Sequence, residues 1–144
     1  MVPALLLTRC AAMLAQSFML IGQVHGGITV GEVARKHFPE VEEMVIELAG
    51  MIRTTVSVSF KPEMPERLCA YSEQVEFFPT AVKELKWRNG WFYRYSLLEG
   101  KRTLPDGRTI EMPDPTPMHT DYLLHLRDKG ELDLSEIKAE GMVW

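Results

Sequence analysis

The sequence predicts an all-α protein with one small β-hairpin near residues 102–110. Three features predict this class. Residues 3–23 are rich in strong helix formers, and residues 39–54 carry apolar side chains at the three- and four-residue spacing of one buried helix face. A Pro-Asp-Gly turn motif lies inside residues 102–110. A chain of 144 residues is long enough to bury a core without disulfides.

The first predicted helix covers residues 3–23. Pro3 suits its first turn, where the missing N–H costs nothing, and the Gly-Gly pair at 26–27 ends the segment. Thr29 is then expected to cap a short helix that extends to Lys36.

The next predicted helix covers residues 39–54. One face of this segment is apolar throughout and is expected to enter the core, namely Val41, Met44, Val45, Leu48, Met51 and Ile52. Residues 56–60 are rich in β-branched side chains, and we expect them to form an extended connection.

Residues 66–99 allow two interpretations. The pair Asn89-Gly90 between apolar flanks is the best short-range signal for a two-residue hairpin turn. A helix over the same segment would place a largely apolar stripe on one face, namely Phe78, Ala81, Val82, Leu85, Asn89, Phe92 and Tyr95. The local signals leave both interpretations open.

The C-terminal part begins with prolines at 113, 115 and 117, which form a stiff connector. A last helix is expected to begin near Thr116 and to end at Gly130. The sequence therefore predicts one helical domain over residues 1–130, followed by a tail over 131–144 that is short helix or irregular.

Charge and composition exclude several classes of protein. The net charge of −4 and the pI near 5.6 argue against a nucleic-acid binder. Two cysteines without close spacing favour a reduced, cytoplasmic protein. Arg9 and Gln16 interrupt the apolar N-terminal run, so no membrane span is expected. The four histidines are scattered without ligand spacing, and no metal site is predicted.

Residues 71–100 resemble the late signature of ketopantoate reductases. In that signature a Ser precedes a helix, a Glu and an Asn-Gly pair follow, a Gly comes ten residues later, and a Pro-containing step enters the last helix. The matching residues here are Ser72, Glu84, Asn89-Gly90, Gly100 and Thr116-Pro117. The intervals from Glu84 to Gly100 match without a gap, and residues 101–115 look inserted.

The resemblance covers roughly residues 3–129 and implies a fold. This fold is the all-helical C-terminal domain that ketopantoate reductases share with 6-phosphogluconate dehydrogenases, in which residues 80–98 would be mainly helix. The chain starts about where that second domain would begin, and it contains no GxGxxG or P-loop motif. We therefore expect no NAD(P) to bind to this chain alone. A full-length enzyme would receive NAD(P) from a dinucleotide-binding domain that is missing here.

The resemblance also implies a substrate site for a small 2-keto acid. Glu84 corresponds to a catalytic Glu, Ser72 to a Ser that hydrogen-bonds the substrate, and Asn89 belongs to the same motif. The family has a catalytic Lys on the first helix, whereas the first 35 residues here contain none. The nearest basic residue is Arg9, with Ser17 two turns later where the family often has Asn. An Arg can hold a carboxylate but is a poor proton donor. Weak binding without turnover is therefore expected.

The same residues also allow structural roles. Glu84 can pair with Arg88 on a solvated helix face, Ser72 can cap a helix, and Arg9 can extend its charge out of a core helix. The alternative function is then a stand-alone helical interaction module without catalysis. An unrelated α+β ligand-binding protein built on an Asn-Gly hairpin is a weaker option.

A homodimer is expected in either case. The first helix is apolar on nearly every side, which suits burial against a second chain better than exposure. Leu5, Leu6 and Met13 are the residues expected near this contact.

Overall fold

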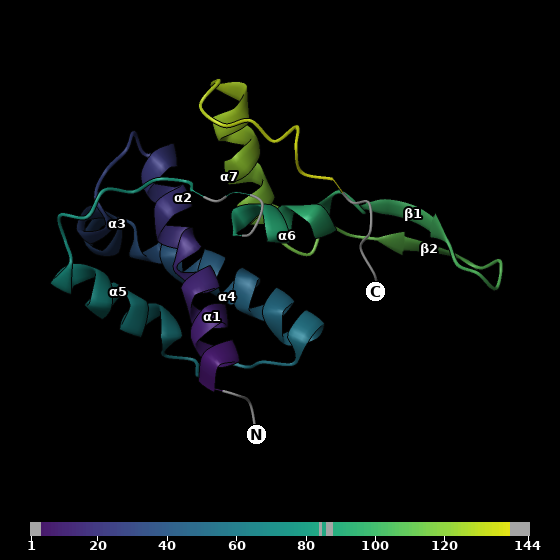
Figure 1. The fold of residues 1–144 in the computed structure, drawn as a ribbon, viewed down its shortest axis with the longest axis horizontal. Coiled ribbons are helices and arrows are strands. Elements are labelled where there is room, and N and C mark those ends of the chain that lie inside the picture. Colours follow the sequence, from purple (N-terminus) through teal and green to yellow (C-terminus); the bar gives the residue numbers. More distant parts are fainter. Residues whose placement is uncertain (1–3, 84, 86–87, 139–144) are drawn as a thin grey trace.

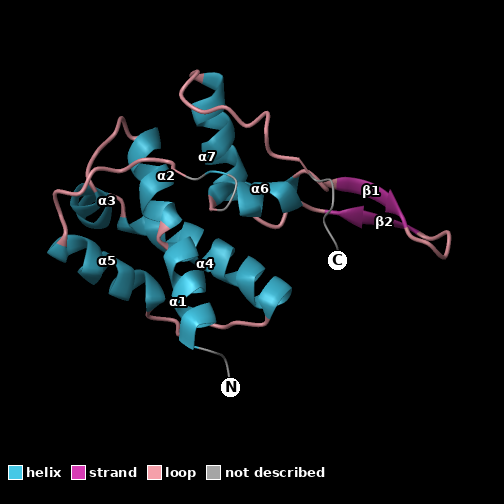
Figure 2. Cartoon of the chain, in the orientation of Figure 1, coloured by secondary structure: helices cyan, strands magenta, loops and turns pink. Residues whose placement is uncertain are grey.

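Helices dominate the computed structural model, which describes residues 4–83, 85 and 88–138, with the backbone alone for residues 4–8, 101–103 and 112 (Figure 2). The elements are α1 (Ala4–Leu14), α2 (Gln16–Val24), α3 (Val30–Lys36), α4 (Phe38–Val56), α5 (Met64–Gln74), α6 (Asn89–Ser96), β1 (Gly100–Thr103), β2 (Thr109–Met112) and α7 (Pro117–Asp128). The mostly helical architecture is that of the all-α class.

The helices are arranged around α2 and α4. Helices α1 and α2 follow one another through the middle of the molecule, and α4 crosses them (Figure 1). Helices α3 and α5 pack together on one side, while α7 contacts α2, α4 and α6 on the other. The β1–β2 hairpin projects beyond the helices at the edge of the molecule (Figure 1).

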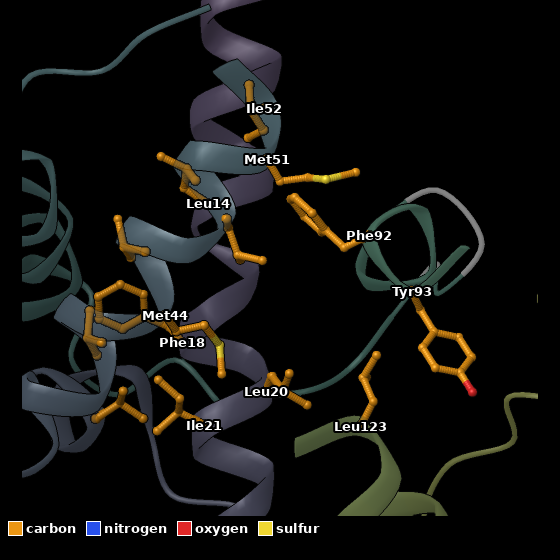
Figure 3. Close-up of a cluster of buried hydrophobic side chains, with 14 of the residues drawn as sticks. Leu14, Phe18, Leu20, Ile21, Met44, Met51, Ile52, Phe92, Tyr93 and Leu123 are labelled. Atoms are coloured by element: carbon orange, nitrogen blue, oxygen red, sulfur yellow. The ribbon is translucent and has the colours of Figure 1, made fainter. Parts of the chain in front are cut away.

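The core forms where α1, α2 and α4 meet the C-terminal helices. Phe18 of α2 lies beside Met44 of α4, Leu20 of α2 lies toward Leu123 of α7, and Phe92 of α6 lies beside Met51 of α4 (Figure 3). The predicted apolar face of α4 is confirmed, because Val41, Met44, Val45, Leu48, Met51 and Ile52 are all buried. Each such side chain contributes about 1.5–3 kcal/mol to the free energy of unfolding.

The predicted helix over residues 3–23 is divided at Ala15. This residue still has right-handed dihedrals, so α2 continues α1 after a local break. Two side chains bond to backbone carbonyls here: Gln16 Nε2 donates to the Ala12 oxygen at 3.1 Å, and Ser17 Oγ donates to the Leu14 oxygen at 2.8 Å. Such local bonds compete with the regular helix ladder and bend helices.

The N-cap predicted at Thr29 is confirmed. Its hydroxyl accepts a hydrogen bond from the Glu32 backbone N–H at 3.3 Å, and α3 begins at the next residue. The hairpin near residues 102–110 is also present. Its register runs from Gly100 opposite Met112 to Thr103 opposite Thr109, and Gly107 in the turn has a φ of 87°, which favours glycine.

The helix expected over residues 80–98 is wrong for its first part, because residues 80–83 are not helical. Tertiary hydrogen bonds hold the start of this segment beside residues 23–29. Thr80 Oγ1 donates to the Ile28 carbonyl at 2.6 Å, and Gln23 Nε2 donates to the Thr80 carbonyl at 2.6 Å. Pro79 pairs with Thr29 in an isolated bridge. These partners lie some fifty residues away in the sequence, so a local pattern could not show them.

The Asn89-Gly90 pair begins a helix instead of turning a hairpin. Helix α6 starts at Asn89 and ends at Ser96. Gly90 is needed for a close approach, since a Cβ at this position would lie 2.3 Å from the Leu85 carbonyl oxygen. Glycine at position 90, which favoured a turn in the sequence, is therefore required by the close packing of the backbone against Leu85.

Helix α7 is capped by a residue of α4. The Thr116 side chain makes no cap hydrogen bond, although the helix begins at the next residue. Instead the Glu47 carboxylate accepts from the Met118 N–H at 3.1 Å and from the His119 N–H at 2.9 Å. Glu47 thus satisfies two of the free N–H groups at this helix start and fixes α7 against α4.

The segment after α7 also packs on the domain. Leu134 and Ile137, which lie in the expected tail, are only 6% and 5% exposed. Ile137 lies close to Gly90, where its Cδ1 would be 2.7 Å from an added Cβ. Residues up to 138 therefore share the core of the helical unit, without forming a helix of their own.

Candidate functional site

A cavity of about 750 Å³ lies beside α1 and the start of α2. Arg9, Gln16 and Arg88 supply its polar lining, and Ala12, Met13, Ala15 and Tyr71 supply the rest. Arg9 and Gln16 are seven residues apart on consecutive helices, a spacing that brings two side chains to one face. Arg9 and Arg88 therefore bring two cationic side chains to the lining of this cavity.

The Gln16 amide gives this cavity a fixed polar group. The residue is 5% exposed, and its Nε2 already donates to the Ala12 carbonyl. Its Oε1 has no hydrogen-bond partner among the described residues. A buried oxygen of this kind costs free energy unless a donor reaches it.

A smaller apolar cavity of about 190 Å³ adjoins the first one. The two cavities share Ala15 and Tyr71 as lining residues. Ser72 is the polar side chain of this second cavity, and its other lining residues are Phe18, Met19, Val30, Leu68, Val75 and Phe78. Ser72 lies within the last turn of α5, so its expected role as a helix N-cap is wrong.

The remaining predicted site residues lie elsewhere. Ser17 is fully buried and bonds to the Leu14 carbonyl of its own helix segment. Asn89 is fully buried as well, and its Oδ1 pairs with His119 Nε2 at 2.8 Å. Glu84 lies outside the described residues. The structure therefore brings Arg9 and Ser72 to adjoining cavities and gives Ser17 and Asn89 internal partners.

His119 and Asn89 form a buried polar pair in the core. Burial lowers the pKa of His119 to about 3, although the nearby Asp114 charge acts in the opposite direction. The imidazole is therefore neutral at physiological pH. The ring also meets Phe92 edge to face, with the ring centroids 5.4 Å apart. This pair joins α6 to α7, and both of its residues are fully buried.

Two of the histidines that are scattered in the sequence share a carboxylate partner in the fold. His25 Nε2 lies 2.8 Å and 3.0 Å from the two Glu40 oxygens, and His37 Nδ1 lies 3.2 Å from Glu40 Oε1. The Tyr122 hydroxyl donates to Glu40 Oε2. The chain returns on itself through α3, which places the end of α2 beside the start of α4. That return cannot be seen in the sequence spacing.

Sequence reasoning missed three residues of the main cavity: Gln16, Tyr71 and Arg88. A signal was present for Gln16, because it follows Arg9 at helical spacing and is polar within an apolar helix. Arg88 and Tyr71 reach the cavity from other segments, so only the folded chain could place them.

No family model, curated protein or solved structure matches this chain. The resemblance of residues 71–100 to ketopantoate reductases therefore stays a prediction. Among the helices that the structure describes, none has both the length and the apolar character required to cross a bilayer.

Proposed function

We propose that this chain is the substrate-binding and dimerisation domain of a ketopantoate-reductase-like NAD(P)-dependent oxidoreductase, and that it binds small 2-keto acids without turning them over alone. The observation that carries the proposal is the cavity shared by Arg9, Gln16 and Arg88. The residue resemblance and the mostly helical fold support it.

The carboxylate of the ligand is assigned to the arginine end of the cavity. A guanidinium offers two parallel N–H donors that match the two oxygens of a carboxylate. Arg9 is exposed on α1 and faces the same space as Arg88, which is half-buried.

The apolar side chain of the ligand is assigned to the adjoining cavity. Phe18, Leu68 and Val75 line it, and its volume of about 190 Å³ suits a short branched chain. The Ser72 hydroxyl, 5% exposed, is the polar group that a ligand could meet there. The role that the resemblance gives to Ser72, hydrogen bonding to the substrate, is consistent with this position.

We propose that no nicotinamide cofactor binds to this chain alone. Within the described chain the strands form the β1–β2 hairpin, and neither strand enters a helix through a glycine-rich turn. Such a turn is what usually cradles the pyrophosphate. The cofactor is therefore assigned to a separate dinucleotide-binding domain. With Arg9 in place of a lysine, the cavity holds an anion but offers a poor acid for a carbonyl oxygen.

A titration with 3-methyl-2-oxobutanoate tests the proposal. The wild-type chain should bind this 2-keto acid in the millimolar range, and its uncharged analogue 3-methyl-2-butanone should bind far more weakly. Arg9→Gln should weaken binding roughly tenfold, because a hydrogen bond to a charged group contributes about 1.5–3 kcal/mol. Arg53→Gln makes the same change of charge on α4, away from this cavity, and should leave binding unchanged.

Equal binding by wild type and Arg9→Gln would contradict the proposal and favour the interaction module. One observation favours that module independently. Tyr71, Phe77 and Phe78 are exposed by 61%, 83% and 59% of their surface, and large exposed aromatics mark contact surfaces. Tyr71 and Phe78 also line the apolar cavity, so a partner covering it would exclude a small ligand.

The homodimer remains part of the proposal. Met13 is half-buried and lines the arginine cavity, while the side chains of Leu5 and Leu6 lie outside the described residues. Sedimentation at tens of micromolar measures the state of association. A monomer would contradict the proposed dimerisation role. It would not bear on acid binding, which the titration tests separately.

A further inference from the structure

Two histidines and a glutamate meet at the junction of α2, α3 and α4. His25 follows α2 directly, His37 lies between α3 and α4, and Glu40 belongs to the first turn of α4. One ligand-type atom of each residue, His25 Nε2, His37 Nδ1 and a Glu40 oxygen, lies within 4.8 Å of the others. This cluster is separate from the arginine cavity, with which it shares no residue.

The spacing of these atoms suits a small transition-metal ion. Zinc binds histidine nitrogens and carboxylate oxygens at about 2.0–2.2 Å, so ligand atoms around a tetrahedral ion lie about 3.3 Å apart. Glu40 Oε1 lies 2.8 Å from His25 Nε2 and 3.2 Å from His37 Nδ1. These two distances would have to increase by only a few tenths of an ångström for the ion to be coordinated by both pairs of atoms.

The surroundings of Glu40 prepare it as an anionic ligand. Two groups hydrogen-bond its carboxylate, the Tyr122 hydroxyl and His25 Nε2. Tyr122 bonds Glu40 Oε2 and so leaves Oε1 directed at the histidines. Metal-binding carboxylates commonly have an outer hydrogen-bond partner of this kind.

The ends of three helices meet at this cluster. His25 follows the C-terminal end of α2, where the partial charge of the helix dipole is negative, whereas His37 lies between the negative end of α3 and the positive end of α4. The two rings are stacked, with centroids 3.8 Å apart, so one ring must turn for both nitrogens to point at one ion. His25 has room to turn, because its side chain is 33% exposed and Gly26 and Gly27 follow it.

We propose that His25, His37 and Glu40 form a binding site for a divalent transition-metal ion of the zinc class. Two imidazole nitrogens and one carboxylate oxygen favour Zn²⁺, Co²⁺ or Ni²⁺ over Mg²⁺ and Ca²⁺, which prefer all-oxygen sites. Three protein ligands at a partly exposed position leave further coordination positions to water or to a ligand. This site does not depend on the proposed function.

Titration calorimetry with Zn²⁺ on the full chain tests the proposal. One ion should bind per chain, and a large excess of Mg²⁺ should not displace it. His25→Gln, His37→Gln and Glu40→Gln should each weaken binding by roughly a hundredfold or more, because each removes a ligand, whereas loss of an outer partner costs about 10–100-fold. Tyr122→Phe should weaken it by a smaller factor, because it removes only the outer partner of Glu40. His125→Gln removes an exposed histidine outside the cluster and should leave the affinity unchanged.

Nitrogen NMR of the histidine rings gives a second readout that does not require a variant. Zn²⁺ should shift His25 Nε2 and His37 Nδ1 together, with saturation at one equivalent. The proposal is overturned if the two rings do not respond together, or if His25→Gln binds Zn²⁺ as tightly as the wild type. It is also overturned if His125→Gln loses as much affinity as the cluster variants.

Discussion

Removing the Glu47 carboxylate should detach the start of α7 from α4. Glu47 accepts from the Met118 and His119 N–H groups, and hydrogen bonds to a charged group contribute about 1.5–3 kcal/mol each. Part of that gain is offset, because burial raises the pKa of the Glu47 carboxyl despite these two bonds. A net loss of about 2 kcal/mol is therefore expected for Glu47→Ala, at the upper end of the range for helix caps.

Urea unfolding followed by circular dichroism measures this loss. A decrease of about 2 kcal/mol corresponds to a fall of roughly 4–8 °C in Tm for a domain of this size. Glu42→Ala is the matched control, because Glu42 is exposed on the same helix and should change stability by no more than about 0.5 kcal/mol. If Glu47→Ala and Glu42→Ala had the same stability, the capping role of Glu47 would be refuted.

Two further predictions concern the core. Gly22→Ala should lower the free energy of unfolding by about 1–3 kcal/mol, because its Cβ would lie 2.2 Å from Thr80 Cγ2, whereas Gly50→Ala in open space should raise it by up to about 1 kcal/mol. Equal effects in urea unfolding would contradict this. His119 has an ordinary pKa of 6.5 and a folded value of about 3, so stability should fall as pH falls through this window, when only the unfolded chain takes up the proton. Unfolding midpoints at about pH 7 and pH 5 should therefore differ less in His119→Phe than in the wild type, and an equal difference would refute the assignment.

The sequence predicted those parts of the fold in which local signals and packing agree. The buried face of α4 followed from helical spacing, and the cap at Thr29 followed from residue type. Residues 80–83 belong to a stripe with helical apolar spacing, yet they are not helical, and Thr80 bonds to Ile28 and Gln23 instead. Tertiary hydrogen bonds therefore outweighed a weak helical preference there.

The candidate site was predictable to a smaller degree. Arg9 was identified from its place in an apolar helix, and it does line a cavity. Asn89 was assigned to a substrate because of a motif, whereas its partner in the fold is His119. Residue type alone cannot separate a buried structural amide from a ligand contact, because both need a hydrogen-bond partner.

The two proposed sites lie at opposite ends of α2, which makes their tests independent. Gln16 faces the arginine cavity at the start of this helix, and His25 follows its end. Nine residue steps separate them, about 14 Å along the axis, and this exceeds the distance of about 8–10 Å over which salt screens exposed charges. Neither site shares a lining residue with the other. A change of charge at Arg9 should therefore not alter zinc affinity, and His25→Gln should not alter acid binding. Each variant serves as the folding control for the other titration, so a loss confined to one ligand reports on that site rather than on the stability of the domain.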